Sequence, residues 1–324
     1  MIPLRDTIRS KNYPVVNTLL IAANVLVFLI QMAQGPEQTR FIWTYGLVPA
    51  RYSFPEIAAH FTSSQQVLAL FSFMFLHGGF WHLLGNMWFL YIFGDNVEDH
   101  LGPFRYLLFY LFCGWASGLF HLLLNWQSPA PTIGASGAIA GVMGAYLILF
   151  PHSKILTLIP ILFIPYFIEI PAFFFLGIWF FLQFLGAAGT AAQGGGVAWW
   201  AHVGGFVAGI LLLKVSQRIP QTGLTGRMRE ATLKTGTPRL QVAKAYDSPE
   251  DPHLYGTIAL APEEVLLGAR KLISVKWGFR SRILRVSVPS GVAEGTVLRL
   301  SGLGKLMPDG KKGDLLLRVM IPEA

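Results

Sequence analysis

Long apolar runs separated by short polar segments fill the first two thirds of the chain. A helix needs about 20 mainly apolar residues to cross a hydrocarbon core about 30 Å thick, because each residue rises about 1.5 Å. The first of six such runs follows a basic leader, residues 1–14, and is too long for a signal-peptide core. The pattern predicts an all-α polytopic membrane protein over residues 15–213, with six transmembrane helices at residues 15–34, 80–101, 106–124, 135–150, 168–186 and 197–213.

One further apolar stretch, residues 155–170, is interrupted by Pro160 and Pro165. Proline removes a backbone donor and breaks a helix, so this stretch is not counted as a span. A buried loop and a half-helix both remain open for it.

The pattern changes after residue 213. Residues 214–254 are polar, without periodicity, and predict a cytoplasmic linker. In the rest of the chain, residues 255–324, two apolar segments at 283–288 and 315–321 predict strands, and turn residues stand at 289–291, 302–304 and 308–310. A small soluble β-rich domain is expected here.

Charge follows the same division. Only 13% of the residues are charged, against about 25% in soluble domains. Residues 1–213 carry no net charge and residues 214–324 carry +8, which excludes a nucleic-acid footprint over the whole molecule.

A single cysteine, Cys113, excludes a disulfide framework and a thiolate metal cluster. Because the sequence has no Walker motif, dinucleotide fingerprint or metal-ligand cluster, we expect no cofactor, no metal and no nucleic-acid partner.

Basic residues also predict the orientation in the membrane. Lys and Arg flanking transmembrane helices favour the cytoplasmic side. With the leader inside, the basic residues on the inner side are Arg5, Arg9, Lys11, Arg105, Lys154, Lys214 and Arg218. The outer loops hold almost no Lys or Arg, and the exceptions are Arg40 and Arg51 in the long first loop. The expected topology has both termini in the cytoplasm, and we expect a prokaryotic plasma membrane.

Polar residues inside spans are costly and indicate function. Four of them, His82, Asn86, Ser136 and His202, fall in the first turns of the second, fourth and sixth predicted spans, at one depth near the outer surface. Each alone is explained by helix packing or by an interfacial position. The four together predict a reactive site.

The chemistry of that site follows from the residue types. Ser136 needs a base to become a nucleophile, and His202 is the candidate. Ser136 begins a helix after Gly134, so nearby backbone N–H groups lack intrahelical partners. His82 and Asn86, four residues apart on one helix face, add side-chain donors for an oxyanion. No acidic residue lies at this depth, which predicts a Ser-His dyad.

Small residues recur on the fourth and sixth spans at near-helical spacing. Such residues let two membrane helices approach closely, which would bring the serine to the histidine. They are Gly137, Gly141, Gly144, Ala201, Gly205 and Gly209.

These motifs resemble those of the rhomboid family of intramembrane serine proteases over residues 15–213. The resemblance rests on His82-x-x-x-Asn86, Gly134-Ala-Ser-Gly137, Ala201-His-x-x-Gly205 and Gly94-x-x-x-Glu98-x-x-x-Gly102. It implies a six-helix bundle with a water-filled cavity that opens outward, in the lipid bilayer, and transmembrane protein substrates.

By residue, the resemblance implies Ser136 as nucleophile, His202 as base, and His82 and Asn86 as oxyanion donors. Glu98 would be structural. The family's Trp-Arg pair before the second span is absent, with Leu68-Ala69 near that place. The alternatives are a non-catalytic rhomboid-like protein that binds client transmembrane helices, and a transporter. The absence of charge at mid-membrane depth argues against the transporter.

The end of the chain resembles the carboxy-terminal domain of DnaJ-type co-chaperones over about 65 residues. The segment is Pro289-x-Gly291-x-x-x-Gly295-x-x-Leu-Arg-Leu-x-Gly302-x-Gly304, followed by Gly313-Asp-Leu315. The resemblance implies a module that holds an extended peptide; a tether or an oligomerisation surface is the alternative. Its basic residues predict a solvated face or contact with anionic lipid: Arg270, Lys271, Lys276, Arg280, Arg282 and Arg285.

Overall fold

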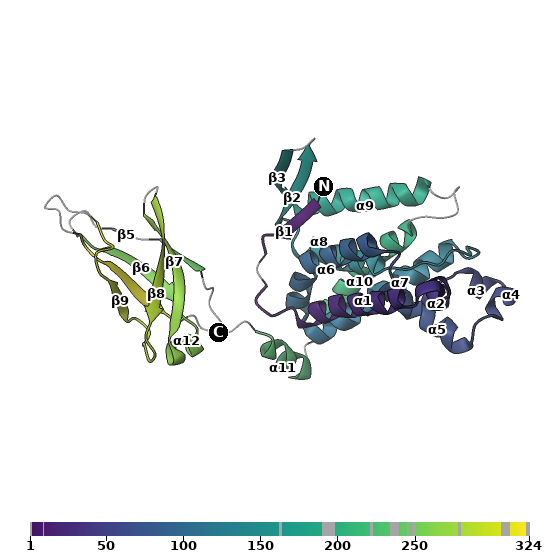
Figure 1. Cartoon of the computed structure of the whole chain (residues 1–324), viewed down its shortest axis with the longest axis horizontal. Helices are drawn as coiled ribbons and strands as arrows, with labels where there is room; N and C mark the ends of the chain where they lie inside the picture. Colours follow the sequence, from purple (N-terminus) through teal and green to yellow (C-terminus); the bar gives the residue numbers. More distant parts are fainter. Residues whose placement is uncertain are drawn as a thin grey trace. The chain divides into compact units, whose positions relative to one another are not determined.

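A computed structural model of the chain divides into two compact units, Met1–Leu233 and Lys234–Ala324 (Figure 1). Each unit has its own hydrophobic core and is described by itself. The structure describes residues 2–8, 10–161, 164–189, 198–220, 223–233, 240–244, 246–247, 251–277, 280–305 and 312–321.

The first unit is mainly helical, and a helix stands at each of the six predicted positions. These are α1 (Val15–Ala33), α6 (Phe80–Leu101), α7 (Pro103–Leu124), α8 (Ser136–Leu149), α9 (Ala172–Gly189) and α10 (Trp199–Arg218). Shorter elements fill the first loop: η1 (Gly35–Glu37), α2 (Gln38–Tyr45), α3 (Ala50–Ser53), α4 (Pro55–Ala58), α5 (Ser63–Ser72) and η2 (Phe73–Phe75). A last helix, α11 (Gly223–Ala231), follows α10.

The expected count of six spans is not confirmed by helix length and hydropathy. Among the described residues, four helices are long and apolar enough to cross a bilayer: α1, α7, α9 and α10. The α5–η2 segment and α6 pass the same test only together and meet at a 75° bend, which raises the count to five. The remaining apolar helix, α8, has 14 residues.

The stretch 155–170 is neither a buried loop nor a half-helix, so both expectations for it are wrong. It forms a β-hairpin from β2 (Lys154–Ile161) and β3 (Ile164–Pro171), and β1 (Ile2–Asp6) from the basic leader pairs antiparallel with β2 (Figure 1). The two prolines are tolerated because Pro160 lies opposite Pro165 at the end of the hairpin, beyond the four residues of β2 that pair with β1. The fifth predicted span accordingly begins only at Ala172.

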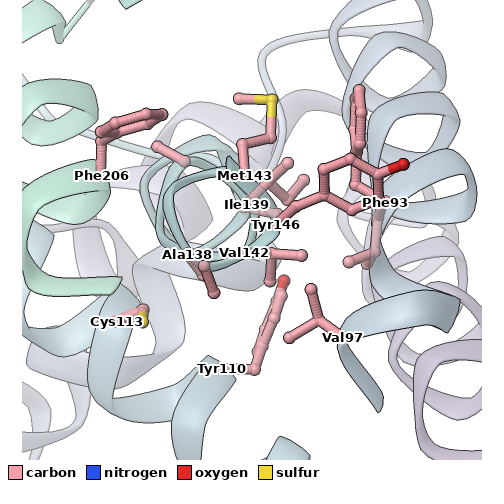
Figure 2. Close-up of a cluster of buried hydrophobic side chains, with 14 of the residues drawn as sticks. Phe93, Val97, Tyr110, Cys113, Ala138, Ile139, Val142, Met143, Tyr146 and Phe206 are labelled. Carbon is pink, nitrogen blue, oxygen red and sulfur yellow. The ribbon is translucent and has the colours of Figure 1, made fainter. Parts of the chain in front are cut away.

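Helix α8 occupies the centre of the first unit. All ten residues from Gly137 to Tyr146 are buried. Figure 2 shows α8 nearly end-on, with Phe93 and Val97 of α6 on one side, α7 below, and Phe206 of α10 on the other side. A helix buried on every side can be built almost entirely from small and apolar residues, which explains the composition of this segment.

The second unit contains two sheets. One has the order β5 (Tyr246–Asp247), β6 (Leu254–Ala259), β10 (Leu315–Met320) and β9 (Val297–Leu300). The other has the order β4 (Leu240–Lys244), β7 (Ala269–Trp277) and β8 (Arg280–Val288), and α12 (Pro262–Leu267) precedes β7. The predicted strands at 283–288 and 315–321 are confirmed as β8 and β10, and the chain has a β-containing carboxy-terminal region.

Other expectations for this part differ from the structure. Residues 214–254, expected as a linker, hold the end of α10, α11, β4 and β5. Lys271 does not belong to an exposed basic face, because its side chain is 1% exposed and forms an ion pair with Glu264. The turn at 308–310 and the side chains of Lys276, Arg280 and Arg282 lie outside the described part of the chain.

Candidate active site

Ser136 and His202 come together although 66 residues separate them. Ser136 is the first residue of α8, and His202 lies in the first turn of α10. The distance from His202 Nε2 to Ser136 Oγ is 2.8 Å, which is a normal hydrogen bond. A serine hydroxyl in this contact can pass its proton to an imidazole nitrogen as it attacks.

Glycines allow the two helices to come this close. A Cβ at Gly205 of α10 would lie 2.0 Å from the carbonyl oxygen of Gly137, and a Cβ at Gly209 would lie 2.0 Å from the carbonyl oxygen of Gly141. A Cβ at Gly137 would meet the Ser117 hydroxyl of α7 at 2.1 Å. The α8 and α10 backbones are therefore in direct contact, and larger side chains at these positions would force the serine and histidine apart.

His82 presents a donor toward the serine. Its Nδ1 accepts a hydrogen bond from the Gly78 backbone N–H at 3.2 Å, so its hydrogen is carried on Nε2. Gly134 lies next to that nitrogen: a Cβ there would be 3.0 Å from His82 Nε2 and 3.6 Å from Ser136 Oγ. With φ at +128°, Gly134 also adopts a backbone conformation that disfavours other residues. Glycine thus leaves space between the His82 donor and the serine.

Asn86 lies one turn after His82 on α6 and is 8% exposed. Among the described residues its Nδ2 has no hydrogen-bond partner. A buried donor without a partner destabilises the folded protein, and this one is available to an acceptor that is not part of the described chain. Together with the free backbone N–H groups at the start of α8, His82 and Asn86 make a set of donors suited to a developing negative charge.

Glu98 lies at the opposite end of α6 and contacts the start of α1. Its two carboxylate oxygens accept hydrogen bonds from the backbone N–H groups of Val16 and Asn17 at 2.9 and 2.7 Å. The residue before α1, Pro14, supplies no side-chain cap. Glu98 therefore caps α1 from a neighbouring helix.

Sequence reasoning missed Gln183 of α9, whose Oε1 lies 2.8 Å from His202 Nδ1. Gln183 is a polar residue inside a predicted span, so the rule that selected His202 would have selected it too. A carboxylate is the usual third residue beside such a histidine, and the absence of one at this depth led to the prediction of a dyad without a third member.

Arg51 and His77 were also missed. The Arg51 side chain is buried, donates to the Thr44 carbonyl at 3.1 Å and stacks on Phe61, so it anchors part of the first loop. Burial lowers its pKa to about 10. His77 is fully buried beside His82, with ring centroids 5.3 Å apart, and Gln31 of α1 holds its backbone through two hydrogen bonds.

Comparisons with known proteins identify similar sequences. A family model described as Rhomboid domain matches residues 64–218. Rhomboid protein 1, mitochondrial, of Saccharomyces cerevisiae is 33% identical over 201 residues, which is 59% of this chain and 50% of that protein. RHOMBOID-like protein 1 of Arabidopsis thaliana is 34% identical over 158 residues, 49% of this chain and 36% of that protein.

A human relative, Presenilin-associated rhomboid-like protein, mitochondrial, is 28% identical over 152 residues, 46% of this chain and 36% of that protein. The chain thus spans half or less of the length of these relatives. The match includes Ser136, His202, His82 and Asn86 within its bounds. This multi-pass membrane protein contains a rhomboid domain, which extends over residues 64–218.

Proposed function

We propose that this protein is an intramembrane serine endopeptidase that hydrolyses peptide bonds of membrane-anchored proteins with Ser136 and His202. The observation that carries the proposal is the 2.8 Å hydrogen bond between His202 Nε2 and Ser136 Oγ inside a rhomboid domain. The non-catalytic alternative, a protein that only holds client helices, has no need of this contact.

In the proposed reaction Ser136 Oγ attacks the carbonyl carbon of the substrate while His202 Nε2 accepts its proton. The carbonyl oxygen becomes an oxyanion, which the Ser136 backbone N–H, His82 Nε2–H and Asn86 Nδ2–H stabilise. His202 then gives the proton to the departing amine, which leaves an acyl-serine. Water, deprotonated by His202, hydrolyses this ester and restores the serine.

The substrate and setting follow from the position of the site. A helical substrate must unwind locally to present its carbonyl, so small or helix-breaking residues near the cut are favoured. The basic flanks of the spans support a cytoplasmic location of both termini. Two of the relatives are named as mitochondrial, and a prokaryotic plasma membrane remains our proposal for this chain.

Covalent labelling tests this proposal. Detergent-solubilised protein is treated with a fluorophosphonate, and the wild type is compared with Ser136→Ala and His202→Ala. We expect labelling of the wild type and loss of labelling in both variants, with folding verified by thermal unfolding. A folded wild type that does not label would favour the client-holding alternative.

For the second unit we propose contact with an extended peptide or with anionic lipid. The observation in favour is the outer face of β7 and β8, where apolar Leu272 and Ile283 are 41% and 64% exposed beside Arg270 and Arg285. Such a mixed apolar and basic face suits an extended chain or a lipid surface. Binding of the full chain to vesicles with and without anionic lipid distinguishes the two.

A further inference from the structure

Gln183 is buried in α9 at 7% exposure and makes two hydrogen bonds. Its Nε2 donates to the backbone carbonyl of Trp179 at 3.1 Å, and its Oε1 lies 2.8 Å from His202 Nδ1. The imidazole that contacts Ser136 through one nitrogen is therefore held through the other nitrogen by this amide.

The carbonyl of Trp179 determines which way the amide faces. A carbonyl oxygen only accepts, so the group beside it is the NH₂ of Gln183. The Gln183 oxygen consequently faces His202 and requires a hydrogen on Nδ1. Neutral imidazole carries one hydrogen, so Nε2 is left with a lone pair directed at the Ser136 hydroxyl.

We propose that Gln183 is a positioning residue that holds His202 in the Nδ1–H tautomer, so that Nε2 is ready to accept the proton of Ser136. This inference rests on the proposed protease function and adds to it a neutral third member in place of the carboxylate of classical triads. A neutral amide suits an imidazole inside an apolar bundle, because it orients the ring without adding a buried charge. The Trp179 and Trp199 rings, with centroids 6.0 and 6.2 Å from that of His202, complete the enclosure.

Two substitutions at this position separate orientation from packing. Gln183→Met keeps the volume and removes the acceptor, whereas Gln183→Glu keeps the acceptor and adds a charge. The matched control is Asn24→Leu, which removes another buried amide that donates to the carbonyl four residues earlier, but in α1 away from the site. Each variant is labelled with fluorophosphonate at a series of pH values, and stability is measured by thermal unfolding.

We expect Gln183→Met to label about tenfold more slowly than the wild type across the pH range, because one hydrogen bond that orients the base is lost. Gln183→Glu should recover most of the rate at high pH, and the acidic limb of its rate profile should move up by about one pH unit, because a carboxylate favours imidazolium. Asn24→Leu should label at the wild-type rate.

The ¹⁵N resonances of His202, assigned by comparison with His202→Ala, give a readout independent of activity. The wild type should show the Nδ1–H tautomer, and Gln183→Met a mixture of both tautomers. An unchanged labelling rate and tautomer in Gln183→Met would overturn the inference while leaving the protease proposal intact. Absence of labelling in the wild type would instead overturn the protease proposal.

Discussion

At the scale of single residues, the candidate site combines a hydrogen-bonded serine and histidine with one buried amide donor, on Asn86, that has no partner among the described residues. The Asn86 Nδ2 is buried and unpartnered in the part of the chain that the structure describes, and it lies one turn from His82. In the proposed reaction, the oxyanion would supply the acceptor that this donor lacks.

Asn86→Leu tests this explanation at one residue. The substitution removes an unpartnered donor and keeps the side-chain size, so stability should stay constant or rise, whereas the fluorophosphonate labelling rate should fall about a hundredfold because an oxyanion donor is lost. Thermal unfolding and labelling are measured on the same preparation. A variant that loses stability and keeps its labelling rate would assign Asn86 a purely structural role.

At the scale of elements, the contact between α8 and α10 sets the distance between nucleophile and base. Backbone atoms of Gly137 and Gly141 face Gly205 and Gly209 with no room for a methyl group. Packing of this kind has few ways to adjust, because backbone cannot move aside as a flexible side chain can.

Gly205→Ala should therefore destabilise the first unit by about 1–3 kcal/mol and reduce labelling, because its methyl group must displace the Gly137 carbonyl. The matched control is Gly177→Ala in α9, where a Cβ meets nothing within 4 Å and the gain in helix propensity is about 0.5–1 kcal/mol. Chemical unfolding in detergent measures the free energy of unfolding of both variants. Equal stability of the two variants would contradict the tight contact described here.

The elements also show how far the sequence predicts this structure. Hydrophobic periodicity located all six long helices and two strands, and the cost of polar residues in apolar spans led to Ser136, His202, His82 and Asn86. The hairpin at 154–171 could not be predicted. A short apolar run with prolines is compatible with a loop, a half-helix or a strand, and only its pairing with β1 distinguishes these. Gln183 is a polar residue in an apolar span and was within reach of the same rule, but its contact with His202 of another helix is not contained in the sequence pattern.

At the scale of the whole molecule, the chain combines two units with separate cores. The core of the first unit is built around α8, and that of the second includes Ile258, Ile273 and Leu317 between its sheets. All the candidate catalytic residues belong to the first unit. Separate cores favour separate folding.

A chain ending at Leu233 should consequently insert in membranes, unfold cooperatively and label with fluorophosphonate within about twofold of the full chain. Labelling of both forms at equal concentration checks this expectation. A truncated chain that is folded but unlabelled would assign the second unit a part in activating the site.

The pairing of β1 with β2 constrains how the chain threads the bilayer. Because these strands share one sheet, residues 2–6 and 154–161 lie on the same side, and the chain must make an even number of crossings between them. If α1, α6 and α7 each cross, the expected topology needs α8 as the fourth crossing. Its 14 residues reach only about 21 Å of the roughly 30 Å core. In that topology Ser136, at the outer end of α8, would lie about 9 Å beneath the hydrocarbon boundary, a depth to which the water of the proposed hydrolysis has to be admitted.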